Sequence, residues 1–227
     1  MPPSRPAAYA EEALVAAILD GTYPLGTSLP SERDLAVTLG VTRPTLREAL
    51  QRLSRDGWLL IRQGKPTMVN DFWRSGGLNV LSGLVRHEGR LPANFIPSLL
   101  AVRLDLAPSY AREAVRHNAA AVAAYLDGRL ELADDPAALA GFDWGLHRHL
   151  AGNAENPIYT LILNGFGGFY EAMARRYFAA PAARDASRAF YAELHAATQS
   201  GDAAAAERIT RAAIEASIAL WESAASG

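Results

Sequence analysis

The sequence predicts a mainly α-helical protein in two parts, an N-terminal winged helix-turn-helix and a larger C-terminal all-α bundle. Apolar residues recur at helical spacing through residues 9–56, and a short β-prone hairpin follows them. After residue 78 the chain is rich in alanine and leucine and contains no convincing strand. We therefore expect domains at residues 1–72 and 79–227, with residues 73–78 as a linker.

Composition is typical of a globular protein, since 50% of the 227 residues are hydrophobic and 20% are charged. Cysteine is absent, which excludes disulfides, iron–sulfur clusters, cysteine-ligated zinc and a thiol nucleophile. Glu11 and Glu12 stand where a signal peptide needs apolar residues, and no apolar run is long enough to span a membrane. We expect a cytoplasmic protein without a membrane partner.

The first two helices are delimited by glycine, proline and a serine cap. Residues 9–20 read as a helix that buries Leu14, Ala17 and Ile18, and residues 21–26 break it. A second helix starts after Pro30, with Ser31 as its N-cap and Asp34 approximating the partner of a capping box. Gly40 ends this helix, so a short turn leads into the next one.

The third helix, in residues 41–53, has one apolar stripe. Its core-facing residues fall at helical spacing: Leu46, Ala49, Leu50 and Leu53. Thr42 is one candidate N-cap. Because a residue before proline avoids the α region, a start at Pro44 is the alternative. Two helices joined by a tight turn make a helix-turn-helix, in which the second helix is the reader.

A different face of this helix is polar. Arg43 and Arg47 lie one turn apart, with Thr42 and Thr45 beside them near the helix start. Guanidinium groups, hydroxyls and free backbone N–H groups suit phosphate capture and the reading of base edges in the major groove. The alternative interpretation is an amphipathic helix with a solvated arginine face.

A hairpin with a basic tip follows the reading helix. Residues 58–61 and 66–69 are β-prone, and residues 62–65 form a turn between them. A tip carrying Gln63, Gly64 and Lys65 suits the minor groove beside a major-groove site; the alternative is an ordinary hairpin. Residues 1–70 hold eight basic and seven acidic groups, so DNA binding would depend on arginines sharing one face.

The C-terminal part predicts six or seven helices around a sizeable core. Proline, glycine and aspartate mark the expected breaks, which lie near Pro92, Pro108, residues 134–136, residues 152–153, Pro157, Pro181 and residues 201–202.

The runs at residues 29–36 and 40–50 resemble the GntR superfamily of bacterial transcription regulators. The helical second part is similar to the FadR branch of that superfamily. Further strings resemble the fatty-acid regulators within the branch, namely residues 55–59, 64–67, 70–73, 77–79, 152–153, 156–159, 161–165, 177–179 and Trp221. The resemblance covers nearly the whole chain.

The resemblance implies a homodimer bound to palindromic double-stranded operator DNA. It places the operator contacts at Arg33, Thr42, Arg43, Thr45, Arg47, Gln63, Gly64 and Lys65. Gln63 stands where the resembled regulators carry a histidine, which bears on operator preference. The implied role is repression of fatty-acid degradation genes and activation of genes for unsaturated fatty-acid synthesis.

The resemblance also implies an effector, a long-chain acyl-CoA that binds the helical domain and releases the protein from DNA, with no cofactor. The implied effector residues are Arg103, Tyr177, Tyr191, Ser217 and Trp221. Their types fit, because arginine suits a CoA phosphate and a helical bundle can house an acyl chain. The alternative is that the three aromatic residues belong to an ordinary core.

A metal-containing regulator that senses a small organic acid is the competing hypothesis. Asp143 and His147 match the first two ligand positions of such relatives, at i and i+4 on one helix. The later positions are Tyr191 and Ala213, which cannot replace imidazole ligands, and the registers of His149 and His195 do not match. We therefore expect no metal. His147 also replaces an apolar aromatic residue of the fatty-acid regulators, which alters the expected pocket.

An enzyme is the third hypothesis, and the sequence gives it little support. Histidine and carboxylate residues are present, but the chain has no glycine-rich phosphate loop, no nucleophile elbow and no complete metal set.

Overall fold

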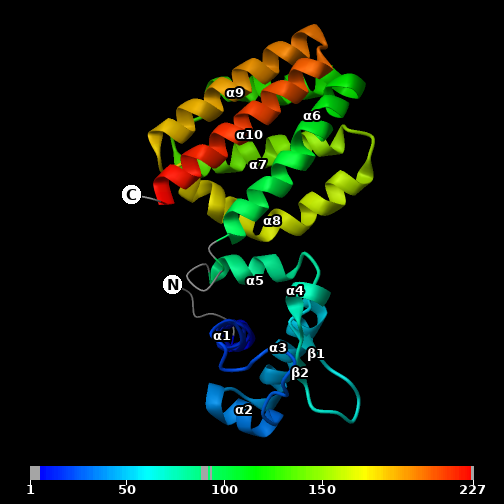
Figure 1. Cartoon of the computed structure of the whole chain (residues 1–227), viewed down its shortest axis with the longest axis vertical. Helices are drawn as coiled ribbons and strands as arrows, with labels where there is room; N and C mark the ends of the chain where they lie inside the picture. Colours follow the sequence, from blue (N-terminus) through cyan, green and yellow to red (C-terminus); the bar gives the residue numbers. More distant parts are fainter. Residues whose placement is uncertain (1–5, 88–91, 93, 226–227) are drawn as a thin grey trace. The chain divides into compact units, whose positions relative to one another are not determined.

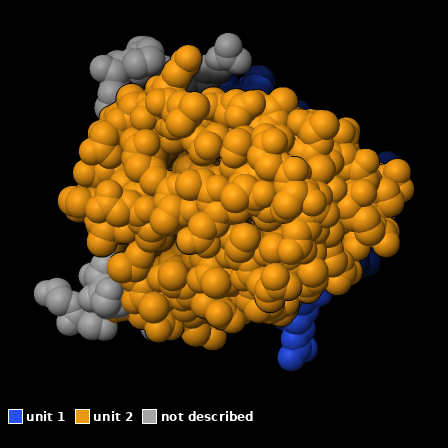
Figure 2. Space-filling model, turned by 90° about the horizontal axis from the view of Figure 1, so that it is seen from above, with its two compact units in different colours: residues 1–92 blue, residues 93–227 orange. Residues whose placement is uncertain are grey.

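The computed structural model describes residues 6–87, 92 and 94–225, and they form two compact units. Unit 1 comprises residues 1–92 and unit 2 comprises residues 93–227, coloured separately in Figure 2. The order of the helices and strands is shown in Figure 1. Within the described part of the chain, no helix is both long and apolar enough to cross a membrane.

Unit 1 begins with two helices close to their predicted limits. Helix α1 spans Pro6–Leu19, three residues earlier than expected at its start, and it buries Leu14 and Ile18. Helix α2 spans Glu32–Leu39, and the Ser31 hydroxyl oxygen caps it by accepting from the Asp34 N–H. Asp34 differs from a capping-box partner, because its carboxylate accepts from the Ser31 hydroxyl rather than from the backbone.

Helix α3, Arg43–Asp56, is the predicted reading helix, and its start is now defined. Thr42 has extended backbone angles, and its hydroxyl oxygen accepts from the Thr45 N–H, so Thr42 is the N-cap and Pro44 lies in the first turn. The stripe of Leu46, Ala49, Leu50 and Leu53 is buried as predicted. Gly57 ends the helix with φ of +96°, a conformation that favours glycine.

The wing is a short antiparallel ribbon of strands β1, Leu59–Leu60, and β2, Met68–Val69. Leu59 pairs with Val69, and Leu60 pairs with Met68. Ser28 also forms a β-bridge with Met68. The segment between α1 and α2 therefore pairs with β2, which the sequence did not predict. Strand β2 thus pairs with β1 on one side and with the α1–α2 segment on the other.

Trp58 is the anchor between the wing and the helices that follow it. Its side chain is buried against Phe72 of α4, Phe72–Ser75, with ring centroids 4.6 Å apart. Helix α5, Val80–Arg86, brings Gly83 against the same indole ring, and a Cβ at residue 83 would lie only 2.6 Å from the ring. Helices α4 and α5 belong to unit 1, which ends at residue 92, whereas we expected a linker over residues 73–78 and a second domain from residue 79.

Unit 2 is a bundle of five long helices in the described residues. They are α6, Phe95–Asp127; α7, Pro136–Gly152; α8, Pro157–Tyr177; α9, Pro181–Ser200; and α10, Ala203–Ala225, with the short 3-10 helix η2, Gly128–Glu131, after α6. Figure 1 shows the long helices running alongside one another. The core draws on α6, α7, α9 and α10, and Tyr110, Leu146, Leu194 and Ile214 are buried in it.

Most predicted breaks are confirmed, and one is wrong. Prolines 136, 157 and 181 each stand at the first position of a helix, where the missing N–H costs nothing. Pro108 instead lies inside α6, and the non-helical residue of that helix is Asn118, with φ of −150° and ψ of 55°. The packing of α6 on its neighbours sustains the helix through Pro108. Local sequence signals do not reveal this packing.

Candidate DNA-binding surface and ligand pocket

The predicted contact arginines of unit 1 project into solvent. Arg33 of α2 is 81% exposed and lies 3.6 Å from Asp34, and Arg43 is also exposed. The Nε of Arg47 donates to the Glu32 carboxylate at 2.7 Å. Glu32 belongs to the preceding helix, so it fixes the direction of Arg47 through Nε, and within the described part of the chain the terminal nitrogens make no hydrogen bond.

Thr42 and Thr45 are tied to each other at the start of α3. Their hydroxyl oxygens lie 2.8 Å apart in a hydrogen bond, and Thr42 also accepts from the Thr45 N–H at 3.3 Å. Both residues therefore hold the helix start in place, and the exposed Thr42 is the more accessible to an outside partner. Arg43 and Arg47, together with the positive end of the helix dipole, make the start of α3 electropositive.

The wing tip is a tight turn with three exposed residues, Gln63, Gly64 and Lys65. The Lys65 N–H donates to the Arg62 carbonyl at 3.1 Å and closes the turn. Gly64 has φ of +71°, so a side chain there would strain the backbone. The turn places Lys65, the only lysine in the sequence, at the end of the ribbon.

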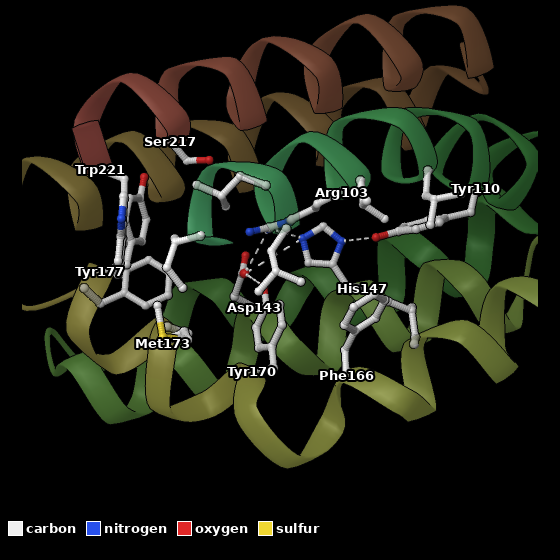
Figure 3. Close-up of a pocket in the computed structure, with 18 residues that line it drawn as sticks. Arg103, Tyr110, Asp143, His147, Phe166, Tyr170, Met173, Tyr177, Ser217 and Trp221 are labelled. Carbon is white, nitrogen blue, oxygen red and sulfur yellow. Dashed lines mark hydrogen bonds and ion pairs between the residues drawn. The ribbon is translucent and has the colours of Figure 1, made fainter. Parts of the chain in front are cut away.

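Unit 2 contains an apolar pocket of about 120 Å³ between α6, α7, α8 and α10 (Figure 3). Arg103, Tyr177, Ser217 and Trp221, which come from three of these helices, all line it. Leucine, phenylalanine and methionine side chains such as Leu106, Phe166 and Met173 form most of the remaining wall. The structure thus brings four of the predicted effector residues to one cavity.

Tyr191, the fifth predicted effector residue, lies behind the cavity wall instead of lining it. Its side chain is fully buried, and its hydroxyl donates to Asp143 Oδ1 at 2.9 Å. The role that the structure supports for Tyr191 is to position Asp143. Direct contact with a ligand would require the wall to move.

Asp143 is the centre of a buried polar cluster in the pocket wall. It accepts from the Arg103 guanidinium at 3.3 Å and from the hydroxyls of Tyr170 and Tyr191. Burial opposes ionisation, but the positive charge of Arg103 and the two hydroxyl donors outweigh it and hold the pKa of Asp143 below its usual value. The carboxylate is therefore charged and paired with Arg103.

His147 stands one helical turn further along α7 and bonds on both ring nitrogens. Its Nε2 contacts the Arg103 guanidinium at 2.5 Å, and its Nδ1 lies 2.7 Å from the Tyr110 hydroxyl. Burial and the positive charge of Arg103 lower the pKa of His147 to about 3. The imidazole is therefore neutral at physiological pH.

The geometry bears directly on the metal hypothesis. Arg103 donates to both Asp143 and His147, so a guanidinium already occupies the position in which a cation would meet this pair. His149 instead contacts the Ala121 carbonyl, and His195 pairs with Asp127. Among the residues that the structure describes, no group of three or more His, Cys, Asp or Glu side chains could hold a metal ion.

Two functional candidates, Tyr110 and Tyr170, escaped the sequence analysis. Tyr110 bonds to His147, and Tyr170 bonds to Asp143 while its ring stacks on Trp144 with centroids 4.6 Å apart. Their helical spacing indicates only core positions. The one available signal was the Asp143–His147 pair itself, because a buried charged residue requires hydrogen-bonding partners.

Comparison with known proteins agrees with this architecture. Residues 6–69 match the model of the bacterial regulatory proteins of the gntR family, and residues 70–226 match the FadR C-terminal domain. The chain belongs to the FadR family of GntR-type transcription regulators. Its family is one of regulators that bind DNA and not of enzymes.

Relatives of this FadR-type regulator cover most of its length. It is 43% identical to the fatty acid metabolism regulator protein of Klebsiella pneumoniae and 44% identical to that of Salmonella paratyphi B. Each alignment covers 86% of this chain and 82% of the relative. Among solved structures, E. coli McbR/YncC superposes with a TM-score of 0.52 at 16% identity, covering 96% of this chain and 98% of that protein. This last likeness concerns the fold alone.

Proposed function

We propose that this regulator controls genes of fatty-acid metabolism and that a long-chain acyl-CoA releases it from its operator. It binds palindromic DNA as a homodimer, represses degradation genes, activates genes for unsaturated fatty-acid synthesis, and acts in the cytoplasm. The observation that carries the proposal is the convergence of Arg103, Tyr177, Ser217 and Trp221 on one apolar pocket. The names of the relatives support the metabolic assignment.

The chemistry of the pocket favours an acyl-CoA over a small acid. Its wall is mostly aliphatic and aromatic, which suits an alkyl chain and gives a citrate-sized trianion few partners. Arg103 is already paired with Asp143, so little uncompensated positive charge remains for a multiply charged acid. Ser217 and Trp221 on α10 supply polar and aromatic groups for the head of the ligand.

The size of the cavity supports a change of state on binding. A volume of about 120 Å³ is smaller than the roughly 300–1,000 Å³ of ordinary ligand pockets. A long acyl chain therefore fits only when the helices around the pocket move apart. A ligand that binds only the opened bundle shifts the population toward it, which is what coupling to DNA release requires.

The DNA half of the proposal relies on the electropositive start of α3 and on the wing tip. Arg43, Arg47 and Thr42 enter the major groove, and Gln63, Gly64 and Lys65 reach the minor groove. Arg33 and Thr45 hold phosphates beside them. Arginine binds guanine bidentately, whereas phosphate contacts only set the register.

Calorimetry of the full chain with palmitoyl-CoA, free CoA and citrate plus zinc tests the effector class. Palmitoyl-CoA alone should bind, and it should lower the affinity for an operator selected from random DNA, measured by fluorescence anisotropy. Trp221→Leu should weaken palmitoyl-CoA binding, while Trp73→Leu, the same change on an exposed tryptophan of unit 1, should leave it unaltered. Binding of citrate with zinc, but not of palmitoyl-CoA, would establish the metal-and-acid alternative instead.

A further inference from the structure

A charged and polar cluster interrupts the mostly apolar wall of the pocket. Figure 3 shows Arg103, Asp143 and His147 between Trp221 with Met173 on one side and Tyr110 on the other, with Phe166 next to His147. An unsubstituted alkyl chain cannot form hydrogen bonds with such a cluster. Burying polar groups costs free energy unless they are hydrogen-bonded. The cluster therefore raises the question of which of its donors lack acceptors.

The contacts of His147 fix the positions of its protons. A guanidinium only donates, so Nε2 of His147, which faces Arg103, accepts and carries no hydrogen. The single proton of the neutral ring is then on Nδ1, which donates to the Tyr110 oxygen at 2.7 Å. Tyr110 is thus an acceptor in this contact.

Two residues that line the cavity each carry a donor for which the described part of the chain supplies no acceptor. The first is the Tyr110 O–H, which keeps its proton because burial raises the pKa of this tyrosine. The second is the Nε–H of Arg103, which is buried from solvent and has no hydrogen-bond partner among the described residues. Both residues line the same cavity and come from α6. Two unsatisfied donors in one pocket point to an acceptor supplied by a ligand.

The charge balance decides what kind of acceptor fits. Arg103 contributes one positive charge, Asp143 compensates it at 3.3 Å, and His147 is neutral. An additional carboxylate or phosphate at this depth would therefore be an uncompensated buried charge. A carbonyl or hydroxyl oxygen accepts from both donors without adding charge.

We propose that Arg103 and Tyr110, oriented by Asp143 and His147, bind an uncharged oxygen of the effector inside the pocket. The oxygen is either the thioester carbonyl of an acyl-CoA or an oxygen substituent on its acyl chain. This inference rests on the proposed function and narrows it, because it assigns the recognised group and adds Tyr110 to the binding residues.

The test is a ligand series measured by calorimetry on the full, unaltered chain. The probes are palmitoyl-CoA, S-hexadecyl-CoA, which lacks the carbonyl, and palmitoyl-CoA carrying one hydroxyl at several chain positions. If the carbonyl is the recognised group, the thioether should bind about tenfold more weakly than palmitoyl-CoA. If the group is a chain substituent, one hydroxylated ligand should bind about tenfold more tightly than palmitoyl-CoA.

Substitution then assigns the difference to the pocket. Tyr110→Phe removes one donor and should abolish most of the discrimination within the series. Tyr125→Phe is the matched control, because its hydroxyl donates to the Phe142 carbonyl and the residue does not line the pocket. Equal affinities across the series for the unaltered chain, or unchanged discrimination in Tyr110→Phe, overturn this proposal alone. Failure of every CoA ligand to bind overturns the proposed function as well.

Discussion

The two units use an arginine–carboxylate pair in opposite surroundings. In unit 1, Arg47 meets Glu32 at 2.7 Å, and the two side chains are 61% and 36% exposed. In unit 2, Arg103 meets Asp143 at 3.3 Å, and they are 27% and 6% exposed. An exposed pair contributes little to stability but keeps its charge available to a partner. In a buried pair, each charge depends on the other, so removing one partner destabilises the fold.

The largest difference should appear in stability. Arg103→Met leaves the Asp143 carboxylate buried without its cation, so we expect unit 2 to lose about 3–5 kcal/mol of unfolding free energy. Arg47→Met, the same change in the exposed pair, should cost at most about 1 kcal/mol. Urea denaturation followed by circular dichroism measures both. Equal losses would show that burial does not separate the two pairs.

Acid should weaken unit 2 through His147. Its pKa is about 3 in the folded protein and about 6.5 when unfolded, so the unfolded chain binds more protons between these values. The contribution of neutral His147 to the free energy of unfolding is therefore fully present above pH 6.5. It falls as the pH drops toward 3, by up to about 1.4 kcal/mol per pH unit. Denaturation of the chain and of His147→Gln at pH 7, 6 and 5 measures this; the variant should lose the slope. Parallel slopes would assign the acid sensitivity to other groups.

DNA binding should respond to Arg47, near the start of α3, and not to Arg55 at the far end of the same helix. Arg47→Ala should weaken operator binding by about 1–3 kcal/mol if it reads a base, with relaxed specificity, or uniformly across sequences if it holds a phosphate. Arg55→Ala, at the far end of α3, is the control. Gel shifts across operator variants give the answer, and unchanged affinity for all DNA would remove Arg47 from the contact surface.

The smallest effect concerns the orientation of Arg47. Glu32→Gln removes the charged acceptor that directs the guanidinium, so the ratio of operator to nonspecific affinity should fall by up to about fivefold. Absolute affinity for nonspecific DNA should not fall, because a negative charge near the phosphates is lost. Anisotropy with the two DNAs at one salt concentration tests this, and an unchanged ratio would mean that Arg47 needs no support from Glu32.

The sequence predicted unit 1 in detail because its signals are local. Ser31, Gly40 and Thr42 act through hydrogen bonds and backbone angles within a few residues of themselves, and the α3 stripe follows from helical spacing. The bridge between Ser28 and Met68 escaped prediction, because it joins segments distant in the chain.

The pocket of unit 2 was predicted only in part for the same reason. Family resemblance identified Arg103, Tyr177, Ser217 and Trp221, which the structure brings to one cavity. It did not reveal that Tyr191 supports Asp143 from behind, or that Tyr110 and Tyr170 complete the cluster. These roles depend on which side chains of four helices meet, and the periodicity of each helix leaves that open.

Pro108 gives α6 a mechanical property of its own. Proline has no N–H, so the Leu104 carbonyl, four residues earlier, lacks its helical partner and one backbone hydrogen bond of the helix is missing there. Arg103 lies just before the missing hydrogen bond in the sequence, and Tyr110 lies just after it. Bending α6 between these two segments therefore disrupts one backbone hydrogen bond fewer than at a regular position, which lowers the cost of spreading the two donors around an incoming oxygen.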